Sequence, residues 1–178
     1  MRGNGSYYFS KLTHVWGWAT WKRAWKKYDV NISFWPDYKN SLEFKNIFRI
    51  KLATSYFSSI FEAVYRQKID TWDYQWTYTC FKNSGLTIIP NINLINNIGF
   101  DTEATHTKNG LSQTINKELK FKESGIFPIK HPISIVRSKS ADNFIEFINY
   151  SGYPKLSLKG LKKFFLKLLF KSKNLLKN

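Results

Sequence analysis

The chain has 178 residues, 43% hydrophobic and 18% aromatic, which is enough to build a core and excludes an intrinsically disordered protein. Lysine and arginine number 28 against 12 aspartates and glutamates, and the net charge of +16 favours an anionic partner such as acidic lipid, nucleic acid or a phosphorylated substrate. A single cysteine, Cys80, excludes a disulfide framework and a cysteine zinc cluster, and no apolar run is long enough to span a membrane.

The elements of the N-terminal part follow from residue pattern. Residues 6–10 indicate a strand, and Trp21 and Trp25 lie four residues apart, on one face of an expected helix. Residues 34–37 indicate a turn. The apolar periodicity over residues 41–68 predicts either one bent helix or two short ones.

A tryptophan pair stands between the first strand and the first helix. Gly17 separates Trp16 from Trp18, and a glycine there indicates a tight approach of the backbone. One interpretation is an aromatic core at a loop-to-helix junction, because aromatic side chains mostly serve packing. The other is a wall of a sugar-binding cleft, because indole faces pack well on the apolar C–H faces of sugars. Both interpretations remain open from the sequence.

Residues 70–107 hold four of the 12 acids and predict a helix, a turn, a strand and a loop in succession. Asp70 or Thr71 is expected to cap the helix by accepting a hydrogen bond from a free N–H group. The helix is expected to stop at residues 83–85, with Gly85 in a left-handed conformation.

Two carboxylates stand at the start of this expected helix. Asp70 and Asp73 are three residues apart, which places them on one helical face. They could act as a general base with a supporting acid. The alternative is that they only stabilise the helix N-terminus, where carboxylates are favoured by the dipole.

A second acidic group follows the strand. The β-branched run 86–89, which ends at Pro90, predicts a buried strand. The loop beyond it carries Asp101, Glu103 and His106. Two carboxylates and an imidazole could bind a hard divalent metal, although acidic loops without a metal are also common.

The C-terminal part is predicted to hold extended chain, a short helix and a basic tail. Residues 127–132 are expected to be extended because of their prolines, and residues 142–150 predict a helix. Residues 155–178 carry eight lysines and no acid, with leucines and phenylalanines in a helical stripe. Such a tail suits an anionic membrane surface or an acidic groove, or else packs on the body as a terminal helix. We therefore divide the chain into a body, residues 1–153, and a tail, residues 154–178.

Four stretches carry a family resemblance: Y-Y-F-S-K-L-T-H-V-W-G-W-A-T-W-K-R-A-W, D-T-W-D-Y-Q-W-T-Y-T-C, I-P-N-I-N-L-I-N-N-I-G-F and A-T-H-T. Together, over about residues 6 to 107, they resemble the C-terminal half of GT-A-type glycosyltransferases, the family 2-like nucleotide-diphospho-sugar transferases, whose bacterial members are sometimes labelled haemolytic proteins. They are also distantly similar to N-acetylglucosaminyltransferase I, which has a W-D-D-W and a later S-H-G element in comparable places.

The resemblance implies roles for particular residues. The acid of the W-D element would be the inverting base, and the late histidine would help to hold the metal-nucleotide. It thus implies Asp73 as base, His106 at the metal-nucleotide and Trp16 to Trp18 beside the acceptor. Together with the residues singled out by pattern, the candidate site residues are Asp73 and Asp70 for catalysis, Trp16, Gly17, Trp18, Trp72 and Trp76 for substrate binding, and His106, Asp101 and Glu103 for metal.

The expected fold class is mixed α/β, helix-rich with a small sheet, as an incomplete GT-A-type fold that holds the acceptor half and ends in an amphipathic helix. The family's nucleotide-binding half, with its Asp-x-Asp metal motif, lies N-terminal to the W-G-W element, and this sequence has neither that motif nor a glycine-rich phosphate loop. A divalent metal, Mn or Mg, is therefore expected only together with the donor half. Without that half we expect the chain to be inactive.

The function expected from the resemblance is that of the C-terminal part of an inverting nucleotide-sugar-dependent glycosyltransferase, with Asp73 as base. Its partners would be a nucleotide-sugar donor, a glycan or lipid-linked acceptor, and a separately encoded N-terminal half. It would be cytoplasmic and peripheral at the inner membrane face, with no nucleic-acid partner. The alternative is a non-enzymatic, haemolysin-like protein that binds an anionic membrane surface through its basic tail.

Overall fold

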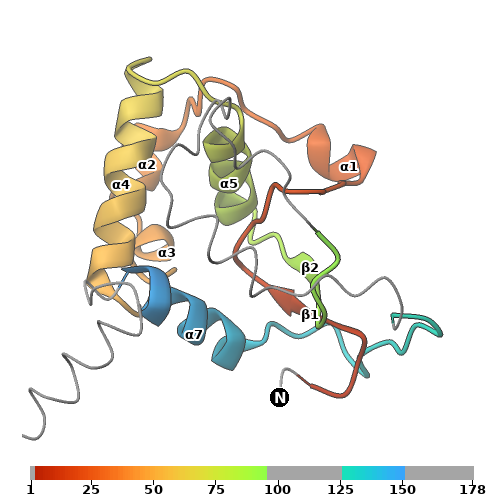
Figure 1. Ribbon diagram of the computed structural model, residues 1–178. Coiled ribbons are helices and arrows are strands. Elements are labelled where there is room, and N and C mark those ends of the chain that lie inside the picture. Colours follow the sequence, from red (N-terminus) through yellow and green to blue (C-terminus); the bar gives the residue numbers. More distant parts are fainter. Residues whose placement is uncertain (1–2, 96–125, 151–178) are drawn as a thin grey trace, which may run out of the picture.

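The computed structural model describes residues 3–95 and 126–150 and shows helices around a small antiparallel sheet (Figure 1). Strand β1 (Tyr7–Ser10) pairs with β2 (Thr87–Pro90), with Phe9 opposite Ile88. Both strands were predicted. The prediction that the second is buried is wrong, because none of its residues is buried and Ile88 is 40% exposed.

Six helices accompany the sheet in the described residues: α1 (Lys22–Trp25), α2 (Trp35–Tyr38), α3 (Leu42–Lys45), α4 (Lys51–Tyr65), α5 (Asp73–Lys82) and α7 (Lys139–Tyr150). Helices α3 and α4 show that the pattern over residues 41–68 encodes two helices. Helices α2, α3 and α4 gather on one side of α5, and α1 lies on the other side (Figure 1). The fold class is therefore mixed helix and strand, helix-rich as expected.

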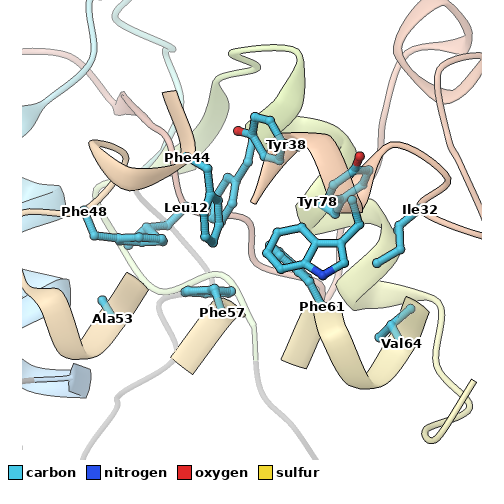
Figure 2. Packing of buried hydrophobic residues seen from close by; sticks show 12 residues of the cluster. Leu12, Ile32, Tyr38, Phe44, Phe48, Ala53, Phe57, Phe61, Val64 and Tyr78 are labelled. Carbon is cyan, nitrogen blue, oxygen red and sulfur yellow. The ribbon is translucent and has the colours of Figure 1, made fainter. Parts of the chain in front are cut away.

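Trp35 forms the centre of the core, although its segment was predicted only as a turn. Its indole is fully buried and meets Phe44, Phe61 and Tyr78 edge-on, at centroid distances of 5.1, 5.4 and 6.4 Å. Its Nε1 donates a hydrogen bond to Glu62 Oε2 at 2.9 Å. Figure 2 shows the rings of Phe44 and Tyr78 beside Phe61 of α4. Edge-to-face contacts of this kind add to the hydrophobic stabilisation of the rings. Most of the buried core residues belong to α2, α4 and α5.

A buried group of charged side chains joins α7 to the rest of the fold. Lys11, which follows β1, donates from Nζ to Glu146 Oε1 and to the carbonyl oxygen of Ile47. The other carboxylate oxygen, Glu146 Oε2, accepts a hydrogen bond from the backbone N–H of Arg49 at 2.8 Å. Burial lowers the pKa of the Lys11 amine, while the hydrogen bond to Glu146 opposes that shift. Glu146 is fully buried, and these hydrogen bonds replace the water that its carboxylate loses.

One turn earlier in α7, Asp142 completes this group, which we call the ion network. Its carboxylate accepts hydrogen bonds from Ser10 Oγ, the Lys11 backbone N–H and Arg137 Nε. Helix α7 therefore packs on β1 through its acidic face, whereas Phe144 and Phe147 on the same helix are 54% and 50% exposed. The apolar residues of this helix did not predict that orientation.

Helix α5 begins and ends differently from the prediction. The N-cap residue is Trp72, which makes no side-chain capping hydrogen bond, so neither Asp70 nor Thr71 is the cap. At the other end Ser84, with a φ of +51°, occupies the left-handed position expected for Gly85. Ser84 N donates to Phe81 O at 3.1 Å and Gly85 N to Cys80 O at 2.8 Å. This pair of bonds is a Schellman motif with serine in the position that glycine usually holds.

We expect Ser84→Gly to stabilise the protein. A side chain in the left-handed region costs about 1–2 kcal/mol, and the greater flexibility of glycine in the unfolded chain offsets part of the gain. The free energy of unfolding in urea should rise by up to about 1 kcal/mol. Ser59→Gly, at an exposed position inside α4, is the matched control and should lower it, because glycine weakens a helix interior. A loss of stability in Ser84→Gly would contradict the assignment of the motif.

Some predictions fall outside the described residues. The basic tail, residues 154–178, and the proposed boundary before it lie there. Within residues 3–95 and 126–150, no helix has both the length and the apolar character needed to cross a membrane.

Candidate functional site

A groove of about 1000 Å³ is lined by residues of both α1 and α5. One wall comes from residues 13–27, which include the W-G-W stretch and α1. The floor comes from one face of α5, and the opposite wall from β2 and residues 91–95. Trp16, Gly17, Trp18 and Trp76, four of the predicted substrate-binding residues, line this groove.

The tryptophans beside the groove form a cluster separate from the core. Trp18 stacks on Trp72, with a centroid distance of 5.2 Å and an interplanar angle of 20°, and lies 5.7 Å from Trp76 and 5.8 Å from Trp25. Trp76 is 7% exposed, whereas Trp16 is 53% exposed. None of these tryptophans belongs to the core cluster around Trp35. The stretch is therefore not the main core, and its exposed rings stand as a wall of the groove.

Gly17 allows the W-G-W loop to close against the opposite wall. Its φ of +59° lies in the left-handed region, and a Cβ atom at this position would lie 2.2 Å from Ile95 Cδ1. Any larger residue would meet both backbone strain and a clash. The tight approach predicted from the sequence is confirmed, and it brings the W-G-W loop against Ile95.

The groove face of α5 carries Trp76, Thr79, Cys80 and Asn83, at the three- and four-residue spacing of one helical face. Burial raises the pKa of the Cys80 thiol to about 11. The thiol therefore stays protonated near neutral pH, which makes it a poor nucleophile. The side chains of Thr79 and Asn83 on this face are uncharged and can form hydrogen bonds with a ligand.

Asp73 is the first residue of α5, three residues before Trp76 on the same helical face. Its Oδ1 atom accepts hydrogen bonds from Thr71 Oγ1 and, at 3.0 Å, from Tyr74 N. Tyr28 lies nearby: its hydroxyl donates to Trp72 O at 3.2 Å, and its pKa is raised by burial and by the charge of Asp73. Asp73 thus stands at the N-terminal end of α5, partly buried beside the tryptophan cluster.

The other predicted polar site residues are not brought together with Asp73. Asp70 is exposed and lies in the loop before α5, so the two aspartates do not share a helical face as expected. Asp101, Glu103 and His106 lie outside the described residues. In the part of the chain that the structure describes, no group of three histidine, cysteine or acidic side chains is placed to hold a metal.

The sequence reasoning missed two cations in the groove. Arg23 and Lys27 both line it, and the guanidinium of Arg23 lies 4.9 Å from the centre of the Trp21 ring. Their spacing of four residues was a signal, since it placed both on one side of the expected helix. The signal was ambiguous, because Lys22 and Lys26 have the same spacing one residue earlier, and the sequence does not show which pair faces the groove.

Comparisons with known proteins give no relative for this chain: no protein-family model, no curated protein and no solved structure matches it.

Proposed function

We propose that this chain is the acceptor-binding and catalytic-base part of an inverting, nucleotide-sugar-dependent glycosyltransferase of the GT-A type. The observation that carries the proposal is the groove walled by Trp16 and Trp18; Asp73 does not line it but begins the helix that forms its floor, three residues before the lining residue Trp76. Indole faces suit the C–H faces of a sugar ring, and the neutral hydroxyl and amide groups of α5 suit its hydroxyls. The family resemblance of the W-G-W and W-D-x-x-W stretches points to the same chemistry.

In this proposal Asp73 takes the proton of the attacking acceptor hydroxyl. As the oxygen forms its bond to the anomeric carbon of the donor sugar, the bond from that carbon to the nucleoside diphosphate breaks. Thr71 and Tyr74 bind Oδ1 of Asp73 and orient the carboxylate. Its Oδ2 atom is then the one directed to the substrate. Trp18, stacked on Trp72, holds the acceptor in place and keeps water away.

The donor partner is a nucleotide sugar, and we propose that it binds to the nucleotide-binding half that the family carries N-terminal to the W-G-W element. A divalent metal, Mn or Mg, would neutralise the leaving diphosphate there. The residues predicted to contact it, Asp101, Glu103 and His106, lie outside the described residues, and the described residues add no further ligand group. The proposal places the enzyme in the cytoplasm, at the inner face of the membrane.

A transfer assay tests this function. The chain is combined with its N-terminal half, Mn²⁺ and a panel of nucleotide sugars and glycans, and acceptor-dependent release of nucleoside diphosphate is measured. Trp18→Ala should lower kcat/KM by about tenfold or more, because the acceptor loses its positioning surface. Leu42→Ala, which removes a 75% exposed side chain on α3, is the control and should leave kcat/KM unchanged. The proposal fails if no donor is consumed in an acceptor-dependent way.

A further inference from the structure

Among the residues that the structure describes, those lining the groove carry positive charge and include no acid. Of the described residues that line it, Arg23 and Lys27 are the permanent cations, and none is an aspartate or glutamate. The four ion pairs of the described residues use other cations, namely Lys11, Lys39, Arg66 and Arg137. Arg23 and Lys27 therefore have no carboxylate partner within the described part of the chain.

The local structure holds these two cations at the groove. Helix α1 continues into a further turn, in which Lys26 N donates to Lys22 O at 3.0 Å and Lys27 N to Ala24 O at 3.0 Å. Residues four apart in such a turn project to the same side. Arg23 and Lys27 thus face the groove, whereas Lys22 and Lys26 do not line it. The stacking of the Arg23 guanidinium on Trp21 restricts its orientation.

From this arrangement we propose that the groove selects an acidic acceptor, a glycan that carries a phosphate or a carboxylate, and that Arg23 and Lys27 bind that anion. The inference rests on the proposed function and names its substrate class. A neutral glycan would leave two unpaired cations beside tryptophan walls, whereas an anionic group satisfies both through charge-assisted hydrogen bonds. The neutral hydroxyl and amide groups of α5 remain for the sugar hydroxyls.

Three oligosaccharides of the same backbone test the proposal: one neutral, one carrying a phosphate and one carrying a glucuronate. Their binding to the full chain is measured by tryptophan fluorescence and calorimetry. At least one acidic form should bind about tenfold more tightly than the neutral form, the size expected for a hydrogen bond between charged groups. The preferred form identifies whether the anion is a phosphate or a carboxylate.

Matched variants separate a specific site from the general attraction of a basic chain. Arg23→Gln and Lys27→Gln should each lose most of the preference for the acidic form and leave binding of the neutral form unchanged. Lys22→Gln and Lys26→Gln remove the same charge from the same helix and should retain the preference. An equal loss in all four variants would overturn the inference, because long-range attraction alone would then explain the binding.

Two further outcomes have distinct meanings. Equal binding of neutral and acidic glycans would overturn this inference alone and leave the proposed transferase intact. The absence of binding by all three glycans would contradict the proposed function as well. A single-stranded oligonucleotide serves as a competitor, because a basic groove with tryptophans also suits stacked bases. If it bound more tightly than the acidic glycans and depended equally on Arg23, the groove would be a nucleic-acid site and the inference would be wrong.

Discussion

Replacement of Asp73 by asparagine should reduce turnover of the assembled transferase by about 10²–10⁴-fold, because a direct displacement needs one base at the acceptor hydroxyl. Asparagine has nearly the same shape, and its side-chain oxygen can still accept the hydrogen bonds from Thr71 and Tyr74. The substitution therefore removes the base and little else. Because the lost interaction belongs to the transition state, kcat should fall while KM changes little.

Stability should change only slightly in this variant. Asp73 lies in the first turn of α5, where a carboxylate interacts favourably with the helix dipole by about 0.3–1 kcal/mol. Thermal unfolding of the variant will show whether a loss of turnover comes from the site or from the fold. A folded and inactive Asp73→Asn protein is the expected result.

Asp70→Asn is the matched control. The residue is exposed, precedes the helix by three positions and is not its N-cap. Its replacement should leave turnover within about twofold of the original, as for a surface substitution. An active Asp73→Asn enzyme would overturn the assignment of the base, and an inactive Asp70→Asn enzyme would move the base to the preceding loop.

Glu146→Ala should be the most destabilising single substitution proposed for this chain. The variant leaves Lys11 buried without its carboxylate and removes the acceptor of the Arg49 backbone N–H. Removing one member of a buried ion pair costs about 3–5 kcal/mol, a large part of the total stability of an ordinary domain. Urea denaturation followed by circular dichroism measures the change.

Two companion variants make this result interpretable. Glu43→Ala removes an exposed carboxylate from α3 and should change the free energy of unfolding by less than about 0.5 kcal/mol. The double variant Lys11→Met with Glu146→Met removes both charges together and should be more stable than Glu146→Ala alone. If the double variant is less stable than Glu146→Ala, the unpaired charge of Lys11 does not explain the loss of stability in Glu146→Ala.

The regular elements of the fold were largely predictable because local pattern determines them. The strands and the existence of α5 follow from periodicity and from proline or glycine signals. The periodicity of residues 41–68 left open one bent helix or two helices, and the structure has two, α3 and α4. The position of Trp35 could not be predicted from local sequence. A Phe-Trp-Pro-Asp sequence indicates a turn, but only the arrangement of α4 and α5 makes its indole the centre of the core.

The orientation of α7 could not be predicted, because it depends on partners far away in the sequence. The sequence predicted a helix over residues 142–150 but not which face it buries: Asp142 and Glu146 face inward beside Ser10 and Lys11, while Ile145 and Tyr150 pack against the core. Similarly, the left-handed residue after α5 is Ser84, one position before the glycine that local preference favoured.

For the candidate site, the sequence indicated the tryptophans and Asp73 but not their arrangement. The sequence named Trp18, Trp72 and Trp76 as substrate-binding candidates, but the stacking of Trp18 on Trp72 joins residues from separate segments and needs the fold. The prediction that Asp70 and Asp73 share a helical face was wrong, because α5 starts at Asp73, after the cap position expected at Asp70 or Thr71. That Arg23 and Lys27 face a groove could not be inferred from the sequence, because the groove is formed by segments that only the fold brings together.

The ion network also bears on how this chain is synthesised. Lys11 leaves the ribosome well before Glu146, its partner in the buried pair, has been translated. Until then the nascent chain holds a lysine whose native position would leave its charge unpaired, so β1 cannot settle against its final neighbours. Contacts between distant segments form late, and such chains complete their folding as a unit. A polypeptide arrested before α7 would therefore remain open to chaperones and proteases.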